Sequence, residues 1–192
     1  MPVTGLILGI DPGLAGTGFG VIDDGRRVVA CGTIQTEPGP AGARLLRIAR
    51  ELEALLGRHR VGEAALEELF LGRNRSSAIG VAEARGAILM TLARTGVPVY
   101  EYKPSQVKSV LTGYGAAGKA QMARMLGTQI DSPAAAQVPA GRGPQRPRTG
   151  PGAGHPVARE VRMDDHAVDA IAIALCHARS RSIRLAAAGG GR

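Results

Sequence analysis

The chain has 192 residues, 44% of them hydrophobic, and a formal net charge of +8, which suits one soluble domain with a sizeable core. No apolar run approaches the ~20 residues of a membrane span, and no basic region precedes a signal-type apolar stretch, so we expect a cytoplasmic protein that does not bind membranes. Its only cysteines are Cys31 and Cys176, which excludes a disulfide framework and predicts two small core residues in a reducing compartment.

The first part of the chain has the pattern of a three-strand meander followed by a helix. Residues 6–11, 18–23 and 28–33 are β-rich runs separated by glycines and by an Asp-Gly turn. Apolar residues then recur with the 3.6-residue period of an amphipathic helix. They are Leu45, Ile48, Ala49, Leu52, Leu55 and Leu56.

The middle of the chain alternates between strand and helix patterns. We predict a strand over residues 63–70, an Ala-rich helix over 76–94 and a last strand over 97–102, ended by Pro104. Further helices are expected over 105–111, 119–126 and 165–178. This order predicts an α/β fold in which a mixed five-stranded sheet is flanked by helices.

Two segments carry most of the positive charge. Residues 128–163 carry +3 and hold six of the twelve prolines and five glycines, so we expect a flexible insertion there. Residues 179–192 carry +4, which leaves 15 basic and 14 acidic residues, a charge of about +1, for the rest. We expect one domain over residues 1–180 and a basic flexible tail over residues 181–192. The net charge alone is therefore weak support for nucleic-acid binding.

Three carboxylates stand where the local sequence buries apolar surface. Asp11 closes the apolar run 6–10, Glu67 interrupts an apolar strand pattern, and Asp169 is the only charged residue between Ala167 and Cys176. Because an isolated buried charge is very costly, such groups must be protonated, hydrogen-bonded or bound to a cation. Acids gathered from remote parts of a chain, without enough Lys or Arg to pair them, are typical of a divalent-metal site.

Four segments resemble the RuvC family of Holliday junction resolvases, nucleases with a ribonuclease-H-like fold. They are GIDPGLAGTGFGVID, ALEELFLGRNRSSAIGVAEARGA, YEYKPSQVKSVLTGYGAAGKAQM and DDHAVDAIAIALCHA, in the family's order. The resemblance implies a homodimer that nicks two strands of like polarity symmetrically across a four-way DNA junction, in recombination and repair. It also implies Mg²⁺ or Mn²⁺ as cofactor and cooperation with the RuvA–RuvB branch-migration complex. Two ions per active site suit phosphodiester hydrolysis.

By the same resemblance, the catalytic and metal-binding positions are Asp11, Glu67, His166 and Asp169. Asp11 on the first strand and Glu67 on the fourth would be adjacent, and the i, i+3 spacing puts His166 and Asp169 on one helix face. Many family members have Asp where His166 stands. Imidazole suits Mn²⁺ better than Mg²⁺ and could instead orient the water as a base.

Each of these positions also has a structural interpretation. Asp11 could cap the turn that follows it. Glu67 could be an exposed strand residue, and only one of Glu67 and Glu68 should enter the site, because neighbouring strand residues face opposite ways. Asp164 and Asp165 are expected to cap the C-terminal helix, with Asp165 as the reserve ligand. His59, His155 and His177 match no constellation and are expected to be surface or packing residues.

The expected DNA contacts are Phe70, Arg73, Arg75, Lys108 and Lys119. The resemblance places Phe70 beside the site, where its ring could stack on an unpaired base or pack in the core. Lys108 and Lys119 match family positions that contact DNA, so we expect them to bind phosphates. The helix over residues 76–94 has small and apolar residues on more than one face, which fits a dimer contact and also a buried helix.

Two other functions remain as alternatives. Residues 113–120 match most of a Walker A motif but follow a helical pattern, and Ala120 lacks the hydroxyl that Mg²⁺ requires. Residues 11–18 resemble the phosphate loop of actin-like ATPases, which leaves an actin-like-fold nucleotide phosphotransferase as a weaker alternative. A non-catalytic junction-binding protein is the other, and paired nicks in a four-way junction would distinguish it from a nuclease.

Overall fold

A mixed five-stranded sheet lies at the centre of the protein. The computed structural model describes residues 5–24, 26–69, 75–131 and 163–189. Of residues 75–77 and 184–189 it describes the backbone alone. The strands, in the order β3-β2-β1-β4-β5, are β1 (Leu6–Asp11), β2 (Gly16–Ile22), β3 (Val28–Gln35), β4 (Val61–Glu67) and β5 (Val99–Tyr102). The first three form the antiparallel meander, and β4 and β5 run parallel to β1. The predicted fold class is confirmed.

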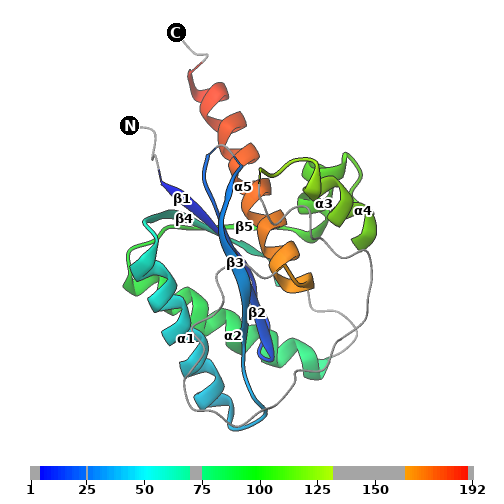
Figure 1. The fold of residues 1–192 in the computed structure, drawn as a ribbon. Helices are drawn as coiled ribbons and strands as arrows, with labels where there is room; N and C mark the ends of the chain where they lie inside the picture. The colour runs from blue at the N-terminus through cyan, green and yellow to red at the C-terminus, as the bar shows by residue number, and fades with distance from the viewer. Residues whose placement is uncertain (1–4, 25, 70–74, 132–162, 190–192) are drawn as a thin grey trace.

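Helices cover both faces of the sheet (Figure 1). The helices are α1 (Ala41–Arg58), α2 (Arg75–Arg94), α3 (Pro104–Thr112), α4 (Lys119–Gly127) and α5 (Asp165–Gly189). Helices α1 and α2 pack on one face, and α5 lies across the other with α3 and α4 beside it. None of the described helices is long and apolar enough to cross a bilayer.

Side chains alternate between two cores, one on each face of the sheet. Along β1, Leu8 and Ile10 belong to the core under α1 and α2, whereas Ile7 belongs to the core under α5. On the α5 side, β1 and β2 carry glycines where the helix crosses them. A Cβ at Gly9 would lie 2.0 Å from the carbonyl oxygen of Ala170 in α5, so only glycine permits this close approach. Cys31 and Cys176 are both buried core residues, as predicted.

The C-terminal segment differs from its prediction. Helix α5 was expected to end near residue 178, and residues 181–192 were expected to be a flexible tail, but the helix continues to Gly189. The added turns contain Leu185 and a run of alanines, which are strong helix formers, and they contain no proline. The helix ends where a run of glycines begins.

The start of the predicted insertion also differs. Residues 128–131 belong to the fold: Ile130 is buried, and the backbone of Asp131 bonds to Arg26 and Val28 beside β3. Because these two backbone hydrogen bonds and the buried Ile130 side chain hold the segment, its polar composition does not decide its structure. Residues 132–162 of the predicted insertion lie outside the described residues.

Candidate active site

The carboxyl ends of β1 and β4 bring two of the predicted acids side by side. The two strands are parallel neighbours, and Ile10 is paired with Leu66. Asp11 and Glu67 are the next residue on each strand and the last residue of each. Because side chains alternate along a strand, both carboxylates point to the face that α5 covers.

A capped helix start places the remaining site residues. The Asp164 carboxylate accepts a hydrogen bond from the Ala167 amide (3.0 Å) and another from the Thr33 hydroxyl (2.6 Å). It therefore acts as the predicted cap and also ties the start of α5 to β3. At the next turn, α5 crosses β2 so closely that a Cβ at Gly18 would lie 2.1 Å from the His166 carbonyl oxygen.

His166 reaches the first acid directly. Its Nδ1 lies 2.8 Å from the Asp11 carboxylate. This hydrogen bond raises the pKa of His166 above its ordinary value, and the charges of Asp11, Asp164 and Asp169 act in the same direction, against the effect of burial. A proton on Nδ1 would donate this hydrogen bond, since a carboxylate oxygen can only accept one.

Glu67 and Asp169 are partly buried and lie close to other carboxylates. Burial, and next the charges of Asp11 and Asp169, raise the pKa of Glu67 to about 7, while Lys108 lowers it. Burial and the charge of Asp11 likewise raise the pKa of Asp169. The Lys119 ammonium lies 3.7 Å from the Asp169 carboxylate, but it is 78% exposed, so this pair is weak.

The four predicted catalytic side chains thus gather at one end of the sheet. Asp165, the reserve ligand, is exposed on the first turn of α5 and acts on Asp169 only through its charge. Lys108 on α3 and Lys119 on α4 both act electrostatically on site carboxylates. Of the other predicted DNA contacts, Phe70, Arg73 and the side chain of Arg75 lie outside the described residues.

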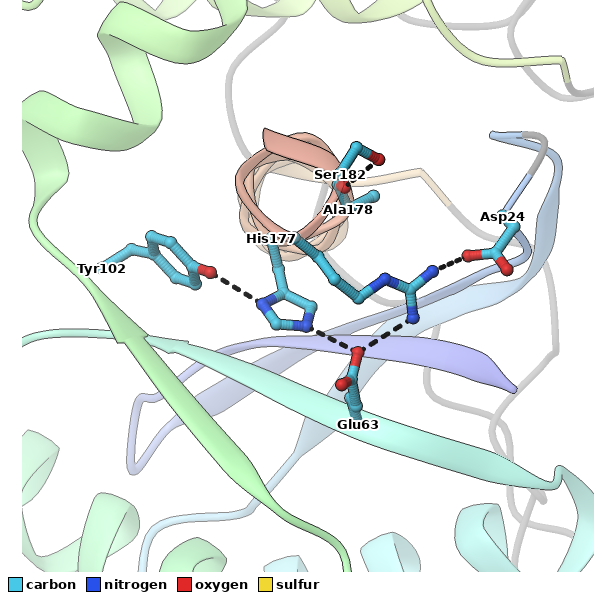
Figure 2. A network of polar contacts seen from close by, with 7 residues as sticks. Asp24, Glu63, Tyr102, His177, Ala178 and Ser182 are labelled. Carbon is cyan, nitrogen blue, oxygen red and sulfur yellow. Dashed lines mark hydrogen bonds and ion pairs between the residues drawn. The ribbon is translucent and has the colours of Figure 1, made fainter. Parts of the chain in front are cut away.

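A second polar cluster lies further along α5 on the same face of the sheet (Figure 2). His177 is fully buried, with Nδ1 2.7 Å from the Tyr102 hydroxyl and Nε2 2.9 Å from the Glu63 carboxylate. The guanidinium of Arg181 donates to the same Glu63 oxygen at 3.0 Å and also binds Asp24. Sequence analysis missed this cluster and treated His177 as a surface or packing residue.

A mixed five-stranded sheet whose adjacent strands β1 and β4 end in carboxylates, crossed by a helix whose first turns carry His166 and Asp169, is the arrangement of the ribonuclease-H-like class of nucleases. The family model described as crossover junction endodeoxyribonuclease RuvC matches residues 7–139. The curated RuvC of Roseiflexus sp. is 42% identical over 174 residues, covering 88% of each chain. That of Pelotomaculum thermopropionicum is 38% identical over 177 residues, covering 90% of this chain and 92% of the relative.

Solved structures agree with the sequence comparisons. The structure of Thermus thermophilus RuvC in complex with a Holliday junction substrate matches with a TM-score of 0.72 and 31% identity, covering 94% of this chain and 96% of that one. The chain belongs to the RuvC family of crossover junction endodeoxyribonucleases.

The donor set fits the divalent-metal dependence that is general in this family. Carboxylate oxygens are the ligands that hard divalent cations prefer, and a cation would relieve the repulsion that raises the pKa values of Glu67 and Asp169. Within the described part of the chain, no three acidic, His or Cys side chains already surround one point at coordination distance. The His166 ring contacts one carboxylate oxygen of Asp11, so a metal ion bound at that oxygen would compete with this hydrogen bond.

Proposed function

We propose that this chain resolves four-way DNA junctions by metal-dependent, symmetric nicking of two strands of like polarity, with Asp11, Glu67 and Asp169 as metal ligands. The observation that carries the proposal is the gathering of these three carboxylates beside the ends of β1 and β4, where burial, and next the charges of neighbouring acids, raise the pKa values of Glu67 and Asp169. A fold does not by itself define an activity. Clustered carboxylates with raised pKa values, at the positions expected in a RuvC-family chain, support junction cleavage by this one.

We assign Mg²⁺ or Mn²⁺, with two ions per site, as the cofactor. Such a pair supplies charge stabilisation for the attacking and leaving oxygens of phosphodiester hydrolysis. The protein's own task is placement: Asp11 and Glu67 hold their carboxylates at fixed strand ends, and α5 supplies Asp169. A cation held by Asp11 would compete with the His166 ring for that carboxylate, and the ring would then be available as a further ligand or as a base for the attacking water.

Lys108 and Lys119 are proposed to bind the phosphates on either side of the scissile bond. Both already act on the carboxylates of the site, so a phosphate that they bind would lie beside the metal ligands. The exposed pair of Lys119 with Asp169 is weak, so Lys119 could exchange it for a phosphate at little cost. Phe70, Arg73 and Arg75 are proposed as further DNA contacts by family position.

Two symmetric nicks require two active sites, so we propose a homodimer. Helix α2 offers a suitable face: Ile79 is 62% exposed and Met90 is 52% exposed, eleven residues or about three turns apart. Gly86 and Ala82 lie exposed on the face between them, where their small size permits a close helix contact. By family, we further propose cytoplasmic action together with the RuvA–RuvB branch-migration complex.

The decisive experiment incubates the protein with a synthetic four-way junction and Mg²⁺ or Mn²⁺. The wild-type chain should give paired, religatable nicks. Asp11→Asn should abolish cleavage and keep junction binding, because it removes a metal ligand and no basic contact. Asp23→Asn, a matched change at an acid that pairs with Arg27 on the β2–β3 turn, should cleave normally. A wild-type chain that shifts the junction on a gel without nicking it would be a non-catalytic binder.

A further inference from the structure

The main-chain carbonyl of Glu67 lacks the partner that the sheet would give it. The Glu68 amide bonds to the Tyr102 carbonyl of β5 at 2.8 Å. Because successive residues of a strand direct their amide groups to opposite neighbours, Glu67 directs its own carbonyl towards β1. The β1 pairing extends to Ile10, so the next N–H on that side would come from Pro12, which has none.

Arg85 of α2 supplies the missing donor. Its Nη1 donates to the Glu67 carbonyl oxygen at 3.1 Å, and its Nη2 pairs with the Glu101 carboxylate on β5. The Arg85 side chain is only 12% exposed, so the guanidinium is held between the helix and the sheet. Its planar fork meets both acceptors at once, which a lysine cannot do with equal geometry.

Helix α2 also braces the other strand of the site. Gly80 lies against Leu14, which follows β1, and a Cβ on Gly80 would approach the Leu14 side chain to 3.3 Å. The Leu14 carbonyl is fixed in turn by the Thr36 hydroxyl at 2.5 Å. One helix therefore contacts the chain at the ends of both strands that carry site carboxylates.

We propose that Arg85 is a positioning residue that fixes the end of β4 and so holds the Glu67 carboxylate where it meets Asp11 and Asp169. The inference rests on the proposed nuclease function. Arg85 touches neither the DNA nor the metal in this assignment. It completes the hydrogen bonding of a backbone group that Pro12 leaves without a partner in the ladder, at the residue whose side chain is a ligand.

The test compares Arg85→Gln, Arg85→Lys and Glu101→Gln, with cleavage rate, junction affinity and Mn²⁺ affinity measured well below each variant's unfolding temperature. Arg85→Gln should lower kcat about 10–100-fold, weaken Mn²⁺ binding and leave junction affinity unchanged. Arg85→Lys should recover part of the loss, since one ammonium can still reach the Glu67 carbonyl. Glu101→Gln is the matched control because it removes the ion pair but keeps that contact, and it should cleave nearly normally.

Equal losses in Arg85→Gln and Glu101→Gln would overturn the inference, because the ion pair and not the carbonyl contact would then matter. Wild-type rates in Arg85→Gln would overturn it as well. If the wild-type chain itself does not cleave junctions, the proposed function fails, and the Mn²⁺ measurement still tests the placement of Glu67. Unchanged Mn²⁺ affinity in Arg85→Gln would then reject it.

Discussion

Glu63 and Glu67 lie four residues apart on β4 and face the same helix, yet their environments shift the pKa values of their carboxyl groups in opposite directions. Glu63 meets His177 and Arg181, whose hydrogen bonds and charges overcome the effect of burial and hold the pKa of its carboxyl below the ordinary value. Glu67 meets Asp11 and Asp169, and its pKa rises to about 7. One carboxylate is fully compensated by protein groups, and the other is not.

The comparison separates a cluster whose charges are balanced by protein groups from the proposed metal site. In the Glu63 cluster, each buried polar group has a protein partner, and the network joins β4, β5 and the β2–β3 turn to α5 (Figure 2). At the other end of the same helix, the acids outnumber the cations that act on them. Such a cluster is satisfied by protonation of a carboxylate or by a bound cation, and the second is what we propose.

The largest expected difference is in cleavage. Glu67→Gln should reduce the rate of junction cleavage about 1,000-fold or more, because it removes a ligand of metal ions that contribute several kcal/mol to catalysis. Glu63→Gln makes the same chemical change on the same strand and should keep the rate within a few-fold of wild type. The measurement is single-turnover cleavage at saturating Mg²⁺. Similar losses in both variants would remove the distinction between the two clusters.

Stability should show the reverse order. Glu63→Ala leaves His177 and Arg181 without their shared acceptor and should cost about 2–4 kcal/mol of unfolding free energy. Glu67→Ala breaks no such pair and should cost much less. Urea unfolding at pH 7 measures both values. A loss below about 0.5 kcal/mol in Glu63→Ala would mean that the cluster contributes little, as exposed pairs do.

Sequence patterns predicted the members of the proposed metal site better than those of the Glu63 cluster. Asp11 and Asp169 stand out because one closes an apolar run and the other interrupts one. The free-energy cost of burying each charge can therefore be recognised from the neighbouring residues alone. Glu63 and His177 are 114 residues apart, and the sequence around either residue does not predict their contact. The same holds for Thr33. Its hydroxyl donates a hydrogen bond to Asp164, the cap of α5, which lies 131 residues away in the sequence. Long-range partners of this kind emerge only when the topology is known.

The predicted ends of two secondary-structure elements also differ from the structure. The fourth strand was predicted to run to residue 70 but ends at Glu67, since beyond it the first strand turns away at a proline and offers no further N–H. The last helix was predicted too short because its basic residues suggested a tail, whereas Arg179 and Arg181 are held by the Val110 carbonyl and by Glu63. In both cases a tertiary contact overrides the local pattern.

The smallest expected effect is a difference in how stability depends on pH, measured in EDTA. The pKa of Glu67 in the fold, about 7, exceeds the ordinary value of 4.5, so the native state binds more protons than the unfolded state between these pH values. Ionised Glu67 therefore destabilises the metal-free fold, and wild-type stability should fall relative to Glu67→Gln as pH rises from about 4.5 to 7. Glu63→Gln should show the opposite trend: its deficit relative to wild type, present at pH 7, should shrink as pH falls below 4.5, because the pKa of Glu63 is lowered. Saturating Mg²⁺ or Mn²⁺ should abolish the first trend and leave the second, since only the Glu67 site gains a cation. A pH trend at Glu67 that survives saturating metal would show that its carboxylate is not a ligand.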